Sequence, residues 1–131
     1  MNQTNLNQLK ILLIDDDSVS NFIASRKLTK IGIENIDSVE NGAQALEYLK
    51  NQSPDLIFLD INMPIMDGHE FMIEYKMREL SEDIHIYILS SSDRACDRGR
   101  FSGFNNIFGY IEKPLEEANI IKAIDKLQVL L

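Results

Sequence analysis

The 131-residue sequence contains a single cysteine and lacks both an excess of positive charge and any long apolar run. One cysteine, Cys96, excludes an internal disulfide and is typical of a reducing cytosol. The net charge of -8 argues against a nucleic-acid-binding surface, because phosphate binding requires a basic stripe. No apolar run approaches the roughly 20 residues that cross a bilayer, and residues 1–8 form a polar leader without a signal-peptide core. These absences predict a cytoplasmic protein that binds neither nucleic acid nor a membrane.

The composition predicts one folded domain. Hydrophobic residues make up 44% of the chain and charged residues 26%, an ordinary balance for a globular protein. A chain of 131 residues can build one core but is too short for two ordinary domains. The sequence contains no internal repeat, linker or low-complexity tract. We therefore expect one domain over residues 9–131, preceded by the polar leader.

Short apolar runs alternate with segments of helical character along the chain. The apolar runs predict strands at 10–14, 33–39, 55–60, 84–89 and 107–111. Helices are predicted from residue 18 to Gly32, around 45–49, from Gly68 through Tyr75, over 93–102 and from Leu115 onward. Ser18 is the expected cap of the first helix, whose apolar positions include Val19, Phe22, Ile23, Leu28 and Ile31.

This alternation predicts an α/β fold with a parallel sheet covered by helices on both faces. For five strand-helix units of this length, the expected arrangement is a flavodoxin-like (βα)5 doubly wound sheet of order 2-1-3-4-5. Ligands of such sheets bind beyond the carboxyl ends of the strands, where the strand order reverses. Asp15 and Asp16 follow the first strand and Asp60 ends the third, so the three carboxylates are predicted to converge there.

Converging carboxylates favour a bound cation. At 4 Å each pair repels by about 1 kcal/mol in water and about 4 kcal/mol at an effective dielectric constant near 20. A site of oxygen ligands open to solvent favours Mg²⁺. Two simpler interpretations stay open at this point: one acid is protonated, or the acids only cap a turn or the first helix.

Two more strand ends contribute polar groups to the same edge. Ser90 ends the fourth strand and Lys113 follows the fifth. A cation and Lys113 together can neutralise the oxygens of a phosphoryl group, and the Ser90 hydroxyl can donate to one of them. Such a site needs little more than an in-line carboxylate nucleophile, since phosphoryl transfer depends chiefly on positioning and charge neutralisation.

At this point the sequence closely resembles the receiver domain of two-component response regulators, of the single-domain CheY-like type. The resemblance spans about residues 9–131. The residues that carry it are Asp15, Asp16, Asp60, Asn62, Met63, Pro64, Asp67, Gly68, Ser90, Ser91, Tyr110, Lys113 and Pro114.

The resemblance implies a role for each matching residue. Asp60 would accept a phosphoryl group from the phosphohistidine of a histidine kinase, with Ser90 and Lys113 holding its oxygens. Asp15, Asp16, Asp60 and the backbone carbonyl of Asn62 would bind Mg²⁺. Ser90 and Tyr110 would form the switch, and Pro64, Gly68 and Pro114 would be structural. The Lys113–Pro114 peptide bond is cis in many relatives.

The resemblance also implies partners. A sensor histidine kinase or phosphotransfer protein would supply phosphate, and a downstream protein would bind the face made by the helix at 93–102, the last strand and the last helix. Because the sequence ends after that last helix, we expect no output domain. We expect a monomer or weak dimer, and a signalling protein rather than an enzyme beyond its own phosphotransfer and autodephosphorylation.

Two alternatives compete with this interpretation. Asp15-Asp16-Asp17-Ser18-Val19 also fits the opening of haloacid-dehalogenase-type phosphatases, with Asp15 as nucleophile and Asp17 as acid/base. That family expects a later acidic pair, which the sequence after Lys113 leaves no room for. The second alternative is a receiver-like scaffold that binds partners without phosphorylation, which the complete set of acids, serine and lysine argues against.

Overall fold

Five parallel strands form one sheet at the centre of the molecule. The computed structural model describes residues 6–91 and 99–130. The strand order is β2-β1-β3-β4-β5, which confirms the predicted flavodoxin-like arrangement. The strands are β1 (Lys10–Ile14), β2 (Asn35–Val39), β3 (Leu56–Asp60), β4 (His85–Ser90) and β5 (Ile107–Glu112).

The apolar run of β3 places it in the interior of the sheet. All five of its residues are buried, as expected for a parallel strand with helices on both faces. It pairs with β1 on one side and β4 on the other, with Ile14 opposite Leu59 and Asp60 opposite Leu89. Because these strands run in parallel and nearly in register, their carboxyl ends lie at one edge of the sheet.

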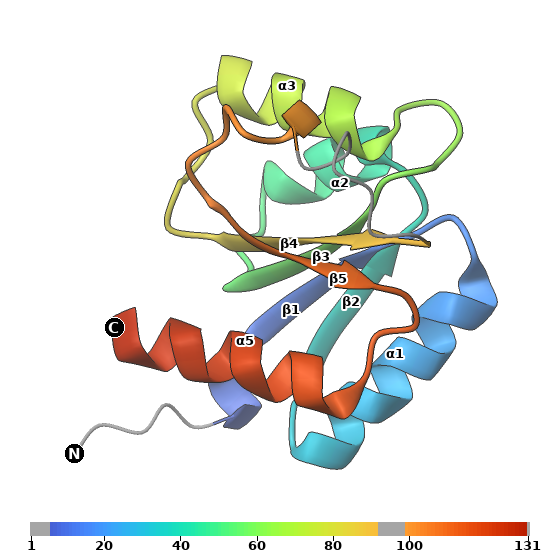
Figure 1. Ribbon diagram of the computed structural model, residues 1–131, viewed down its shortest axis with the longest axis vertical. Helices are drawn as coiled ribbons and strands as arrows, with labels where there is room; N and C mark the ends of the chain where they lie inside the picture. The colour runs from blue at the N-terminus through green and yellow to red at the C-terminus, as the bar shows by residue number, and fades with distance from the viewer. Residues whose placement is uncertain (1–5, 92–98, 131) are drawn as a thin grey trace.

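Helices cover both faces of the sheet, as Figure 1 shows. The helices α1 (Ser18–Ile31) and α5 (Glu117–Leu130) lie on one face, and α2 (Gly42–Leu49) and α3 (Gly68–Met77) on the other. Each face buries its own apolar cluster, one including Leu13, Leu28 and Ile124 and the other including Ile57 and Phe71. None of the helices in the described ranges is long and apolar enough to span a bilayer.

The fourth predicted helix, over 93–102, falls largely outside the described residues, as does Cys96. The last helix begins at Glu117, two residues after the predicted start at Leu115. The second strand begins at Asn35 rather than at Ile33, although Ile33 is buried just before it.

The prediction for the beginning of the first helix was wrong in one respect. Asp17, not Ser18, is the cap: its backbone is extended, and its carboxylate accepts hydrogen bonds from the amides of Val19 and Ser20. A carboxylate at this position satisfies amides that the first turn of a helix leaves unpaired. The carboxylate of Asp17 is therefore used as a hydrogen-bond acceptor at the start of α1.

The apolar positions of α1 do not form one buried face. Leu28 is fully buried, but Val19 and Phe22 are each 62% exposed and Ile23 is 46% exposed. The residues of α1 that turn inward are Asn21, Ala24 and Leu28, at the spacing of three and four residues that places side chains on one face. Hydrophobicity alone therefore indicated the wrong face for the first half of this helix.

Candidate functional site

The three predicted carboxylates meet at the carboxyl edge of the sheet. Asp15 and Asp16 directly follow β1, and Asp60 ends the neighbouring β3. One oxygen from each of the three lies within 4.8 Å of the other two. Asp15 and Asp60 are 3% and 5% exposed, whereas Asp16 is exposed to solvent. The convergence predicted from the sequence is therefore confirmed.

The position of Asp15 is fixed by its neighbours. Its carboxylate accepts a hydrogen bond of 3.0 Å from the amide of Asp17. Its backbone carbonyl accepts one of 2.9 Å from the side-chain amide of Asn21, a buried residue of α1. Sequence reasoning missed Asn21. Its spacing of three and seven residues from Ala24 and Leu28 was the signal that it faces inward.

Lys113 brings a positive charge between the two buried acids. Its amide donates to the carbonyl of Ser90 at 2.8 Å, and its Nζ lies 2.8 Å from Asp15 Oδ2 and 3.1 Å from Asp60 Oδ1. Burial lowers the pKa of Lys113, but its hydrogen bond to Asp15 and the charges of Asp60 and Asp15 outweigh this effect and raise the pKa. Lys113 is thus held as a cation that links the first, third and fifth strands.

The electrostatics of Asp60 differ from those of an ordinary surface carboxyl. Burial, together with the negative charge of Asp15, raises the pKa of Asp60 to about 6, although Lys113 opposes the shift. The ionised form is therefore disfavoured in this cluster. Additional positive charge at the site would lower the pKa of Asp60 again.

The donor set fits a magnesium ion. Asp15, Asp16 and Asp60 supply carboxylate oxygens only, the hard ligands that Mg²⁺ prefers. The exposed Asp16 leaves one side open to solvent, as an ion that keeps several waters requires. Asn62 lies two residues beyond Asp60 in an exposed position, so its predicted backbone contact stays a prediction.

The three predicted structural residues lie in the loops that follow β3 and β5 or at the start of α3 (Gly68–Met77). A side chain at Gly68 would place its Cβ 2.8 Å from the carbonyl oxygen of Asp60, so only glycine fits there. The Lys113–Pro114 peptide bond is cis. Pro64 is exposed in the turn that leads to Ile65.

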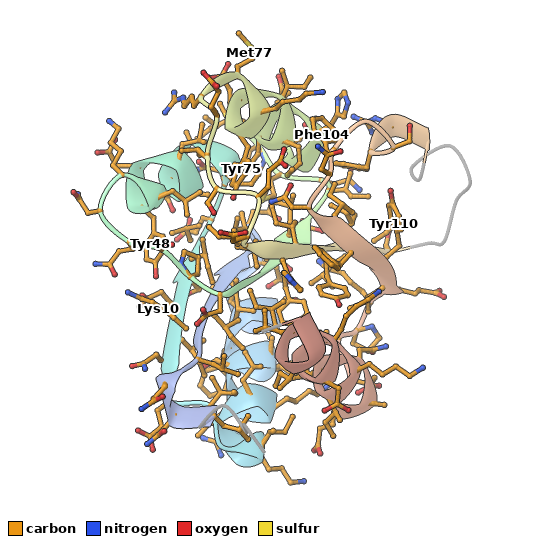
Figure 2. All side chains as sticks on the ribbon, turned by 90° about the vertical axis from the view of Figure 1, so that its left-hand side faces the viewer. Lys10, Tyr48, Tyr75, Met77, Phe104 and Tyr110 are labelled. Atoms are coloured by element: carbon orange, nitrogen blue, oxygen red, sulfur yellow. The ribbon has the colours of Figure 1, made fainter. Side chains whose placement is uncertain are left out.

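Ser90 and Tyr110 lie on the same face of neighbouring strands. Ser90 ends β4, and Tyr110 pairs with Ile88, two residues earlier on that strand. Because side chains alternate along a strand, Ser90 and Tyr110 project to the same side. Tyr110 is half-buried and packs edge-on against Phe101 with ring centroids 6.4 Å apart. Figure 2 shows it projecting from β5 on the α3 side of the sheet. Their coupling stays a prediction.

The site also bears on the phosphatase alternative. That interpretation requires Asp17 to act as an acid or base, but its carboxylate accepts two backbone hydrogen bonds as the cap of α1. The carboxylate that shares the lysine with Asp15 is Asp60, from a different strand. The arrangement therefore disfavours a nucleophile at Asp15 assisted by Asp17.

Comparisons with known proteins agree with this fold. The family model of the response regulator receiver domain matches residues 11–125. The chemotaxis protein CheY of Bacillus subtilis is 32% identical over 117 residues, which cover 89% of this chain and 95% of CheY.

Two solved structures illustrate the likeness. A two-component response regulator from Legionella pneumophila has a TM-score of 0.82 and 32% identity, covering 93% of this chain and 99% of its own. The receiver domain of a sensor histidine kinase from Pseudomonas aeruginosa, with a magnesium ion coordinated in its active-site cleft, has a TM-score of 0.79 and 24% identity, covering 91% and 96% of the two chains. Taken with the fold and the acidic site, these matches show that the chain belongs to the response regulator receiver family of two-component signalling.

Proposed function

We propose that this receiver accepts a phosphoryl group on Asp60 from a protein phosphohistidine in a Mg²⁺-dependent reaction. Asp60 is buried at the base of the acidic cluster, and its Oδ1 lies 3.1 Å from Lys113 Nζ. The observation that carries the proposal is Lys113, which contacts both Asp15 and Asp60 and so provides a fixed cation where phosphoryl oxygens would lie.

The chemistry is a single displacement at phosphorus. A carboxylate oxygen of Asp60 forms a bond to phosphorus as the bond between phosphorus and the imidazole nitrogen of the donor breaks, and the imidazole leaves with the bonding electrons. Lys113 is positioned to balance the charge on the transferred oxygens, and the Ser90 hydroxyl to donate a hydrogen bond to one of them. Asp15, Asp16, Asp60 and the Asn62 carbonyl would hold Mg²⁺, which supplies further charge neutralisation when bound.

The test is labelling with a small phosphodonor. Incubation with radiolabelled acetyl phosphate and Mg²⁺ should label the wild-type protein, and Asp60→Asn should abolish labelling because the nucleophilic oxygen is lost. Asp17→Asn is the matched control: it removes a neighbouring acid while keeping a cap residue, and it should be labelled normally. Stoichiometric labelling of Asp60→Asn would contradict the assignment.

The proposed partners follow from this chemistry. The phosphodonor is a sensor histidine kinase or a phosphotransfer protein in the cytoplasm, and the output is a second protein bound at the face to which β5 and α5 contribute. Phosphorylation adds roughly -1.5 to -2 charge at Asp60, which would draw Ser90 toward the phosphoryl group and leave space for Tyr110 to turn inward. Phosphate biases such a switch only by its difference in affinity for the two states.

The phosphorylation-independent scaffold makes a different prediction for the same experiment. It should bind its partner equally well with and without acetyl phosphate, and Asp60→Asn should not change that binding. We favour the phosphorylated receiver because the acids, Ser90 and Lys113 are all present and Lys113 already contacts two of the acids.

A further inference from the structure

Lys27 of helix α1 contacts the segment 113–116, which follows β5 and carries Lys113. The Nζ of Lys27 donates to the carbonyl oxygen of Leu115 at 2.7 Å and lies 2.8 Å from the Glu116 carboxylate. Leu115 comes two residues after Lys113, just beyond the cis peptide bond. The Lys27 side chain is 25% exposed, whereas that of Lys30, which pairs with Glu117 at 3.4 Å, is 76% exposed. Lys27 is therefore partly buried against the segment, and Lys30 is not.

The space beside Lys113 is not completely filled by side chains. A cavity of about 210 Å³ lies between α1 and the segment after β5, and Lys27 and Lys113 both line it. The backbone of Lys113 is tied to β4 through Ser90, and the side chain of Leu115 is buried. The hydrogen bond from Lys27 to the Leu115 carbonyl therefore joins α1 to this segment beside a space that side chains do not fill.

Helix α1 thus holds two parts of the site. Asn21 donates to the backbone of Asp15, and Lys27, six residues later, donates to the backbone of Leu115. The same helix therefore fixes Asp15 relative to the segment that carries Lys113, which contacts Asp15 at 2.8 Å.

We propose that Lys27 is a positioning residue for Lys113 in the phosphoryl-transfer reaction. This inference rests on the function proposed above. Lys27 does not touch the reacting atoms. It holds the Leu115 carbonyl, and through it the approach of Lys113 Nζ to Asp15 and Asp60. A displacement of about 1 Å at a charged group of this kind can reduce a reaction rate by up to about 100-fold.

The test compares Lys27→Met with Lys27→Arg and Lys30→Met. Met keeps the length of the aliphatic stem and removes the donor, Arg restores a donor, and Lys30→Met removes the neighbouring exposed ion pair. Labelling rates are measured over a range of acetyl phosphate concentrations with saturating Mg²⁺. We expect Lys27→Met to lower the limiting rate roughly tenfold without changing the half-saturating acetyl phosphate concentration. Lys27→Arg should recover most of the rate, and Lys30→Met should match the wild type.

Glu116→Gln separates the two contacts of Lys27. It removes the ion pair but leaves the bond to the Leu115 carbonyl, so a labelling rate close to wild type is expected. Thermal melts of each variant show whether it is folded, and Lys27→Ala, which also lacks a donor, replaces Lys27→Met if the latter does not fold. Wild-type labelling kinetics in whichever of these two variants is folded would overturn the inference.

A second measurement does not depend on phosphorylation. Amide hydrogen exchange at Lys113, whose amide donates to Ser90, should be faster in Lys27→Met than in wild type and in Lys30→Met. If the wild-type protein is not labelled at all, the proposed function fails, and this exchange rate then decides the positioning role alone. Unchanged exchange at Lys113 would overturn it.

Discussion

Asp60 differs from an ordinary surface aspartate in its pKa. Its pKa rises from 3.8 to about 6, chiefly because it is buried and lies beside Asp15. A carboxyl with a raised native pKa stabilises the fold at pH values below its unfolded pKa, and this contribution is lost as the pH rises through the native value. The metal-free protein therefore bears a cost at neutral pH for keeping Asp60 ionised.

Asp60→Asn should remove that cost. In EDTA at about pH 8 we expect the variant to be more stable than wild type by about 1 to 3 kcal/mol, since each pKa unit corresponds to about 1.4 kcal/mol. At about pH 4 the two proteins should be nearly equal, because Asp60 is then protonated in the native state. Urea unfolding followed by circular dichroism measures both values. A variant that is less stable than wild type at the higher pH would contradict the raised pKa.

His85 is a second buried titratable residue, outside the site. It is 5% exposed and stacks on Phe108 with ring centroids 3.7 Å apart, and its Nδ1 has no hydrogen-bond partner among the described residues. Burial, helped by the charge of Lys126 and opposed by that of Asp83, lowers the pKa of His85. The unfolded chain therefore binds a proton near pH 6.5 that the native protein does not.

His85→Phe should abolish the resulting loss of stability in acid. The stacking surface is kept and the unpaired nitrogen is removed, so the variant should gain about 1 kcal/mol. This gain should grow as the pH falls below about 6.5. The measurement is the difference in unfolding free energy between His85→Phe and wild type across this range, in which the contribution of Asp60 cancels. A difference that does not vary with pH would refute the argument.

At the scale of the element, the start of α1 offers a direct comparison of two candidate caps. Asp17→Ala should cost about 1 kcal/mol, because two amides of the first turn lose their acceptor. Ser18→Ala should change the unfolding free energy by less than about 0.5 kcal/mol, since Ser18 is the first residue of the helix rather than its cap. Urea unfolding of the two variants distinguishes them, and equal effects would mean that Ser18 contributes to the cap.

The elements show what could be predicted from the sequence and what could not. The apolar run of β3 needed no tertiary information to be recognised as a buried strand. The order of the strands followed from the alternation of strands and helices. The buried face of α1 could not be predicted from hydrophobicity, because the apolar Val19 and Phe22 are exposed to solvent whereas the polar Asn21 is buried. The spacing of Asn21 from Ala24 and Leu28 agrees with an inward position, but its hydrogen bond to the backbone of Asp15 is a contact that no periodicity reveals.

The same limit applies to the site. The residues at the strand ends could be predicted, since parallel strands bring their carboxyl ends together. Lys27 could not be predicted, because its partners Leu115 and Glu116 lie 88 and 89 residues away in the sequence and its identity alone suggests a solvated side chain.

At the scale of the whole molecule, metal binding should be coupled to folding. A ligand that binds only the native state stabilises it by about 2.7 kcal/mol at 100 times its dissociation constant. We expect Mg²⁺ to raise the melting temperature of the wild-type protein. Asp16→Ala should lose this increase, because one of the three converging carboxylates is gone, while its melting temperature in EDTA stays close to wild type.

Asp17→Asn is the matched control for that measurement. It lies beside Asp16 but contributes no oxygen to the cluster, so Mg²⁺ should raise its melting temperature as in wild type. The predicted magnesium site is wrong if Asp16→Ala responds to Mg²⁺ as strongly as this control does.

The bridge from Lys113 to Asp15 joins the end of the last strand of the sheet to the end of the first, and Asp60 lies between them in the sequence. No fragment that lacks either the first or the last strand can assemble the trio. A domain in which either of these strands is missing or unfolded would therefore lack the site, and only a domain with both strands in place could accept a phosphoryl group on Asp60. Phosphorylation of Asp60 would then also indicate that the entire sheet has formed.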